Sequence, residues 1–137
     1  MDRPDTVKDF SENVLRVADG IVEAEGWIIP GDSANYPNGT RSYIYHNPGN
    51  LFGSIYEKRR HNGYSYFEND FVGFYALCHQ IRRYFDGHLP GITDTSSLKD
   101  MLKMYTGLVD GVDLTNYLLT VYNVSGFDQT TTIGQLK

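Results

Sequence analysis

The sequence predicts a single α+β domain that is mainly helical and carries a small antiparallel β lobe. Three observations support this fold class. Four segments repeat apolar residues at helical spacing, one region has short aromatic and β-branched pieces around an Asn-Gly turn, and no linker or internal repeat divides residues 1–137. A chain of 137 residues is long enough to bury one hydrophobic core but too short for two.

The first helix is predicted from Thr6 to about Glu25, because Thr6 and Asp9 form a capping-box-like pair. Apolar residues then recur at helical spacing: Val7, Phe10, Val14, Val17, Ala18 and Ile21. A turn of about 100° per residue places Glu25 on this apolar stripe and Glu23 on the opposite face. A carboxylate on the core side costs stability unless it is used, so Glu25, just before the helix-ending Gly26, is the candidate functional residue.

The region after the first helix is predicted to form a loop and then the β lobe. Residues 28–43 are rich in Gly, Pro, Asn and Ser, which is typical of a loop. Three short pieces with aromatic or β-branched residues are predicted to form a small, irregular antiparallel sheet: residues 43–45, 51–52 and 64–67. Asn62-Gly63 is the hairpin turn between the later strands.

The second half of the chain is predicted to be helical. The apolar stripe of the second long helix, which should stop near Gly87, consists of Phe71, Phe74, Leu77, Cys78, Ile81, Tyr84 and Phe85. A helix over residues 98–105 has a Ser97/Asp100 start signal and Gly107 past its end. Another helix covers residues 114–121 and ends before Gly126, and residues 133–136 form at most one terminal turn.

A polar turn, Asn47-Pro48-Gly49-Asn50, follows the first helix by about twenty residues. Proline suits the second position of a turn, and Gly49 is predicted to supply the positive φ of a type II turn. The two asparagine amides offer donors and acceptors suited to the hydroxyl and acetamido groups of a sugar. Taken alone, these four residues also fit a plain hairpin turn.

The composition argues against several functional classes. Seventeen acidic residues against twelve basic ones give a net charge of −5, so we expect no nucleic-acid partner. The N-terminus lacks a signal peptide and no apolar run approaches about 18 residues, so we expect synthesis in a cytoplasm and no membrane insertion. No metal or cofactor is expected, because metal-ligand spacing is missing from the four histidines, His46, His61, His79 and His88.

Two motifs together carry a resemblance to a known family. A helix ending in Glu25-Gly26 before an aromatic residue, followed by the segment from Ser42-Tyr43 to Asn47-Pro48-Gly49-Asn50-Leu51, resembles the lysozyme-like peptidoglycan-degrading proteins of bacteriophages. These include virion-associated lytic transglycosylases and muramidases. Residues 66–77 are similar to the aromatic strand that enters a helix in this family, and the resemblance covers about residues 10 to 135.

The resemblance implies a lysozyme-like fold with a sugar-binding cleft between the helical part and the β hairpin. It implies Glu25 as the catalytic acid that cleaves the β-1,4 bond between N-acetylmuramic acid and N-acetylglucosamine. The implied substrate-binding residues are Asn47, Asn50, Tyr43, Tyr66, Tyr105 and Tyr117. Bacterial peptidoglycan is the implied partner, with other virion proteins as further candidates. The protein would reside in a phage virion or a host cytoplasm and act in the periplasm or cell wall.

The residues leave the reaction open. Four acids are candidates for a second catalytic carboxylate, and their spacing singles out none: Asp32, Glu57, Glu68 and Asp70. A lone Glu25 favours a lytic transglycosylase, because the substrate's own acetamido and 6-hydroxyl groups can take part in that reaction. Alternatives are a peptidoglycan endopeptidase with Glu25 as base, a non-catalytic wall-binding virion protein, and a purely structural role for Glu25.

Overall fold

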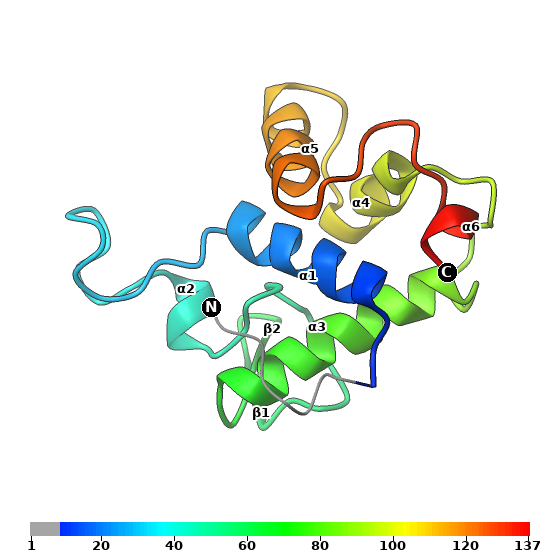
Figure 1. Cartoon of the computed structure of the whole chain (residues 1–137). Helices are drawn as coiled ribbons and strands as arrows, with labels where there is room; N and C mark the ends of the chain where they lie inside the picture. The colour runs from blue at the N-terminus through cyan, green and yellow to red at the C-terminus, as the bar shows by residue number, and fades with distance from the viewer. Residues whose placement is uncertain (1–8) are drawn as a thin grey trace.

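A computed structural model describes residues 9–137 as a mixed fold of helices with one two-stranded antiparallel sheet (Figure 1). The predicted α+β class is confirmed. The elements in chain order are α1 (Glu12–Ala24), α2 (Arg41–Ile44), β1 (Arg59–His61), β2 (Tyr64–Tyr66), α3 (Asp70–Phe85), α4 (Leu98–Thr106), α5 (Val112–Ser125) and α6 (Ile133–Leu136).

Helix α1 is the central helix and packs against α5 and α3, which lie on its two sides in Figure 1. Val17, Ala18 and Ile21 on its apolar stripe are fully buried. Gly20 permits the close crossing with α5, because a Cβ atom there would lie 3.0 Å from the Cα of Val121. The crossing orients the last turn of α1 toward α5.

The predicted start of α1 is wrong. Thr6 and Val7 lie outside the described residues, but residues 9–11 are not helical and the helix begins at Glu12. Ser11 is the N-cap, and its hydroxyl accepts a hydrogen bond from the backbone N–H of Val14 at 3.3 Å. This later capping residue therefore sets the helix start.

The β lobe contains the predicted hairpin. Asn62 and Gly63 both have positive φ, at 50° and 84°, as a type I′ turn requires, and they set the register in which His61 pairs with Tyr64. The prediction of an extended segment at residues 43–45 is wrong, because residues 41–44 form the short helix α2. Residues 51–52 contribute only an isolated bridge from Phe52 to Tyr64.

The later helices follow the predicted pattern with one exception. Phe71, expected on the buried stripe of α3, is 58% exposed because the first turn of this helix packs through Val72 on the β lobe. The Ser97/Asp100 capping box of α4 is confirmed. Helix α5 ends at Ser125, before Gly126, and residues 133–136 form a single terminal turn of helix, as predicted. None of the helices in residues 9–137 has the length and apolarity needed to cross a membrane.

Candidate active site

Glu25 lies at the C-terminal end of α1, where the chain turns away from the core. Its backbone N–H still bonds to the carbonyl of Ile21 at 2.8 Å, and Gly26 then adopts a left-handed conformation with φ 78° that ends the helix. The side chain of Glu25 is partly buried, whereas Glu23 is exposed. The prediction that these two acids face different surroundings is confirmed.

Two hydrogen bonds hold the Glu25 carboxylate, one from each side of the molecule. The side-chain amide of Asn50 donates to Oε2 at 2.8 Å, and the hydroxyl of Tyr117 on α5 donates to Oε1 at 2.8 Å. Both Asn50 and Tyr117 are among the substrate-binding residues that the resemblance implies. Glu25 is thus the point at which the central helix, the turn at residues 47–50 and α5 meet.

Burial raises the pKa of Glu25 above its ordinary value of 4.5, because the charged carboxylate is poorly solvated. The hydrogen bonds from Asn50 and Tyr117 and the charge of Arg41 lower the pKa, but burial is the largest effect. Burial also raises the pKa of Tyr117 well above its ordinary value, so its hydroxyl remains protonated and able to donate. Glu25 therefore stays protonated to a higher pH than a solvated glutamate does.

The turn at residues 47–50 differs from the predicted one. The N–H of Asn50 bonds to the carbonyl of Asn47 at 3.0 Å, but the positive φ belongs to Asn50, at 50°, and not to Gly49. Gly49 is needed for space instead, since a Cβ atom there would lie 2.7 Å from the Tyr105 hydroxyl and 2.8 Å from Cδ1 of Leu77. The same Tyr105 hydroxyl donates to the Gly49 carbonyl at 2.6 Å and so fixes the turn against α4.

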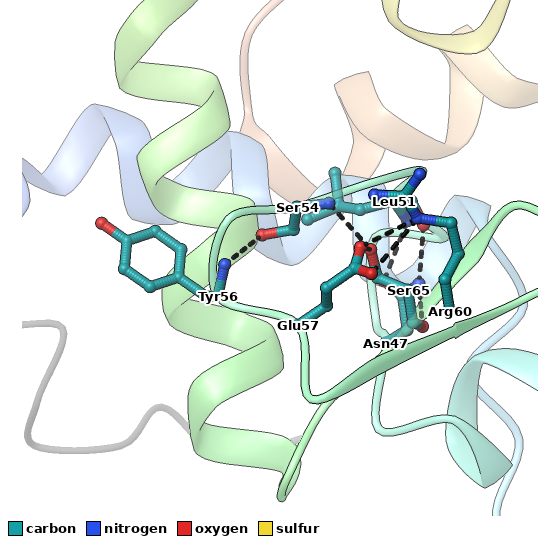
Figure 2. Close-up of polar contacts among 7 residues, drawn as sticks. All are labelled: Asn47, Leu51, Ser54, Tyr56, Glu57, Arg60 and Ser65. Atoms are coloured by element: carbon teal, nitrogen blue, oxygen red, sulfur yellow. Dashed lines mark hydrogen bonds and ion pairs between the residues drawn. The ribbon is translucent and has the colours of Figure 1, made fainter.

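Asn47 does not face the cleft, contrary to the prediction that it binds substrate. Its side chain is fully buried and donates to the carbonyls of Leu51 and Ser65 at 3.0 and 2.9 Å (Figure 2). Its oxygen accepts from the N–H of Leu51 at 2.9 Å. Because the hydrogen bonds of the Asn47 amide all go to the backbone of Leu51 and Ser65, this side chain stabilises the turn. Asn50 is the asparagine that contacts Glu25.

A cleft of about 630 Å³ opens beside Glu25, between the β lobe and the helices α3 and α4. Of the predicted substrate-binding residues, Asn50 and Tyr105 line it. Tyr117 reaches Glu25 but lines a second hollow of about 360 Å³. Tyr43 and Tyr66 are not part of the lining: Tyr43 packs on Trp27 with ring centroids 5.4 Å apart, and Tyr66 packs on Tyr45 at 5.4 Å.

Glu57 was one candidate for a second carboxylate, and the structure gives it other partners. It accepts from the Ser65 hydroxyl at 2.9 Å and pairs with Arg60 at 3.2 Å (Figure 2). Ser65 in turn accepts from the N–H of Ser54 at 2.9 Å. Glu57 therefore stabilises the loop that forms one wall of the cleft.

None of the remaining three candidate acids lines the cleft. Asp70 contacts His46 Nδ1 at 2.6 Å, Glu68 pairs with Lys58 at 3.3 Å, and Asp32 is exposed in the loop after α1. Among the described residues, Glu25 is the only carboxylate that lines the cleft.

Sequence reasoning missed the cationic residues of the cleft, Arg41 and Arg83. A signal for Arg83 was present, because Ala76, His79, Gln80 and Arg83 have helical spacing and share the face of α3 that lines the cleft. Arg41 follows an irregular loop, where no periodicity could place it.

No group of three metal-ligating side chains occurs within residues 9–137. No protein-family model, curated protein or solved structure matches the chain.

Proposed function

We propose that this chain has a lysozyme-like fold and cleaves the glycan strand of bacterial peptidoglycan, with Glu25 as the general acid. The observation that carries the proposal is the partly buried Glu25 carboxyl in the wall of an open cleft, held at both oxygens by Asn50 and Tyr117. Two sequence motifs resemble phage peptidoglycan-degrading proteins. One contains Glu25 and the other contains Asn50, and the hydrogen bond between these two residues joins the motifs at the cleft.

The chemistry requires an acid that is protonated before the reaction. Breaking the bond between the muramic C1 and the bridging oxygen leaves an alkoxide unless a proton reaches that oxygen. A carboxyl whose pKa is raised by burial retains its proton to a higher pH than a solvated glutamate does. Hydrogen bonds from Asn50 and Tyr117 then stabilise the carboxylate that forms as the proton leaves.

The lone carboxylate in the cleft lining supports a transglycosylase route. In the first half of the reaction, Glu25 gives its proton to the leaving oxygen of N-acetylglucosamine as the C1–O bond breaks. In the second half, the same carboxylate takes the proton of the muramic 6-hydroxyl as its oxygen bonds to C1. The product is a 1,6-anhydro ring, Glu25 regains its proton, and no water is consumed.

The resemblance further suggests a bacteriophage protein that acts on the cell wall, either within the virion during entry or late in infection during lysis. Bacterial peptidoglycan is then the partner, and other virion proteins would be neighbours if the protein is carried in the particle.

The test compares two glutamates in the same segment. Glu25→Gln removes the ionisable proton but retains an oxygen that can accept from Asn50 and an amide that can donate to the Tyr117 oxygen. We expect a folded protein whose cell-wall lysis falls by at least about 10²–10⁴, the usual contribution of general acid–base catalysis. Glu23→Gln is the control, because Glu23 is exposed and two residues away. Equal lysis by both variants and the parent would overturn the assignment.

A further inference from the structure

The cleft is cationic although the protein is acidic. The chain has a net charge of −5, yet the charged side chains in the lining are Arg41, Arg83 and Glu25. His79 also lines the cleft, and burial, followed by the charges of Arg82 and Arg83, lowers its pKa and so favours the neutral imidazole. With Glu25 protonated for catalysis, two guanidinium groups remain as the charges of the lining.

Arg41 is held in place by an aromatic ring rather than by an acid. Its guanidinium carbon lies 3.6 Å from the centroid of the Tyr64 ring, and Tyr64 on β2 also lines the cleft. Stacking on a ring uses the face of the guanidinium and leaves its N–H groups at the edge free to bind a carboxylate in bidentate fashion. Arg41 is near enough to Glu25 for its charge to lower the pKa of that acid.

Arg83 lies along the opposite wall. It shares the cleft-lining face of α3 with Ala76, and the seven residues between them place it about 10 Å further along the helix. Its Nη1 donates to Gln80 Oε1 at 3.2 Å. Neither Arg41 nor Arg83 forms an ion pair with another residue of the described part of the chain. Cations without acidic partners in a concave surface attract an anionic ligand.

We propose that Arg41 and Arg83 select glycan strands that carry carboxylates and discriminate against neutral glycans of the chitin type. This inference rests on the proposed function, because it specifies the substrate of the same cleft. Both glycan types share a β-1,4-linked backbone of acetamido sugars, and that backbone is uncharged. Peptidoglycan adds carboxylates on its lactyl groups or, where these are substituted, on the stem peptides. Either source offers the planar anion that a guanidinium binds.

The test measures binding separately from turnover. In a Glu25→Gln background, we would measure the affinity for solubilised peptide-bearing peptidoglycan, for amidase-treated strands that retain only lactyl carboxylates, and for neutral chitin oligomers. Arg83→Gln and Arg41→Gln should each weaken binding to carboxylate-bearing glycan about three- to tenfold. Loss confined to the peptide-bearing strands assigns the arginines to stem-peptide carboxylates, and an equal loss on amidase-treated strands assigns them to the lactyl groups.

Arg59→Gln is the matched control, because it makes the same charge change on β1 while Arg59 stacks on Tyr66 outside the cleft. Arg41→Lys keeps the charge without the planar group, and it should bind more weakly than the parent and melt at the same temperature. Binding by Arg83→Gln and Arg41→Gln that equals that of Arg59→Gln, or chitin oligomers bound as tightly as peptidoglycan, would overturn the inference.

The two proposals fail in different ways. If the parent protein cuts peptidoglycan but the arginine variants bind and cut like the control, the selection of carboxylates is wrong and the activity stands. If the parent cuts no glycan while binding still depends on both arginines, the carboxylate recognition stands and the proposed catalysis is wrong.

Discussion

Replacing Gly49 by alanine tests whether the turn positions Asn50 against Glu25. The φ of Gly49 is not positive, so alanine brings no backbone strain, and its effect comes from contact alone. The added Cβ would lie 2.7 Å from the Tyr105 hydroxyl and 2.8 Å from Cδ1 of Leu77. Either the turn or the Tyr105 ring must move, and movement of either breaks the 2.6 Å bond from Tyr105 to the Gly49 carbonyl.

The magnitude follows from these two contacts. Overfilling a packed site costs about 1–3 kcal/mol of unfolding free energy, and leaving a buried hydrogen-bonding group unsatisfied costs about 1–3 kcal/mol. We therefore expect Gly49→Ala to lose at least about 2 kcal/mol. A shift of the turn by about 1 Å would also move the Asn50 amide away from Glu25, and a misplacement of that size can reduce turnover about 10²-fold.

The assay combines urea unfolding with the rate of cell-wall lysis in a double-mutant cycle. Tyr105→Phe removes the oxygen that the new Cβ would meet, so Gly49→Ala should cost less in that background than in the parent. Some cost remains because Leu77 is unchanged. Parental stability and activity in Gly49→Ala, or fully additive effects of the two changes, would refute this view of the turn.

Two further predictions test Glu25 and a third tests the packing of α3 behind the turn. Asn50→Gly and Tyr117→Phe each remove a hydrogen bond that lowers the pKa of Glu25, so the alkaline limb of the kcat/KM pH profile should move to higher pH; a move to lower pH would contradict this. Because the pKa of Glu25 is raised on folding, its favourable effect on stability is present below about pH 4.5 and is lost as the pH rises through the folded value. Urea unfolding should therefore show Glu25→Gln gaining stability over the parent as the pH rises from 4 to 8, and a constant difference would argue against a raised pKa. Gly73→Ala would place a Cβ against the backbone carbonyl of His46, and no side-chain rotation can relieve that clash. Thermal melting should therefore show a loss of about 3 kcal/mol or more of unfolding free energy. A melting temperature equal to that of the parent would contradict this packing.

The helical part of the fold could be predicted from the sequence because local signals and tertiary packing agree there. In α4, Ser97 and Asp100 form the capping box that their spacing predicts, and Gly107 ends the helix in a left-handed conformation. In α5, Leu114, Leu118 and Val121 are buried as their spacing requires. Helix caps and apolar stripes depend on residues that lie within one or two helical turns of each other, so their pattern is visible in the sequence.

The wrong predictions concern segments whose structure depends on contacts with residues far away in the sequence. Tyr43-Ile44-Tyr45 favours a strand by propensity, yet Tyr43 packs on Trp27 from a short helix. Asn47 and Asn50 are equivalent as amides in the sequence, and only the positions of the β lobe and Glu25 separate their roles.

The candidate site was predicted in part for the same reason. The helical stripe placed Glu25 on the inner side of α1, and the helical spacing on α3 could have identified Arg83. Arg41 could not be found, because its place in the cleft depends on the loop between α1 and α2 and on the Tyr64 ring from another part of the chain.

Mass spectrometry of peptidoglycan digested by the purified protein tests the central claim most directly. If Glu25 acts alone as acid and then base, the digest contains 1,6-anhydromuropeptides, which are lighter by one water than hydrolysed products and resist reduction by borohydride. Glu25→Gln should release none of them, while Glu23→Gln should release as much as the parent. Reducible muramic ends would require a second catalytic group and contradict the single-acid route. Intact glycan strands with cut stem peptides would contradict glycosidic cleavage by Glu25 altogether.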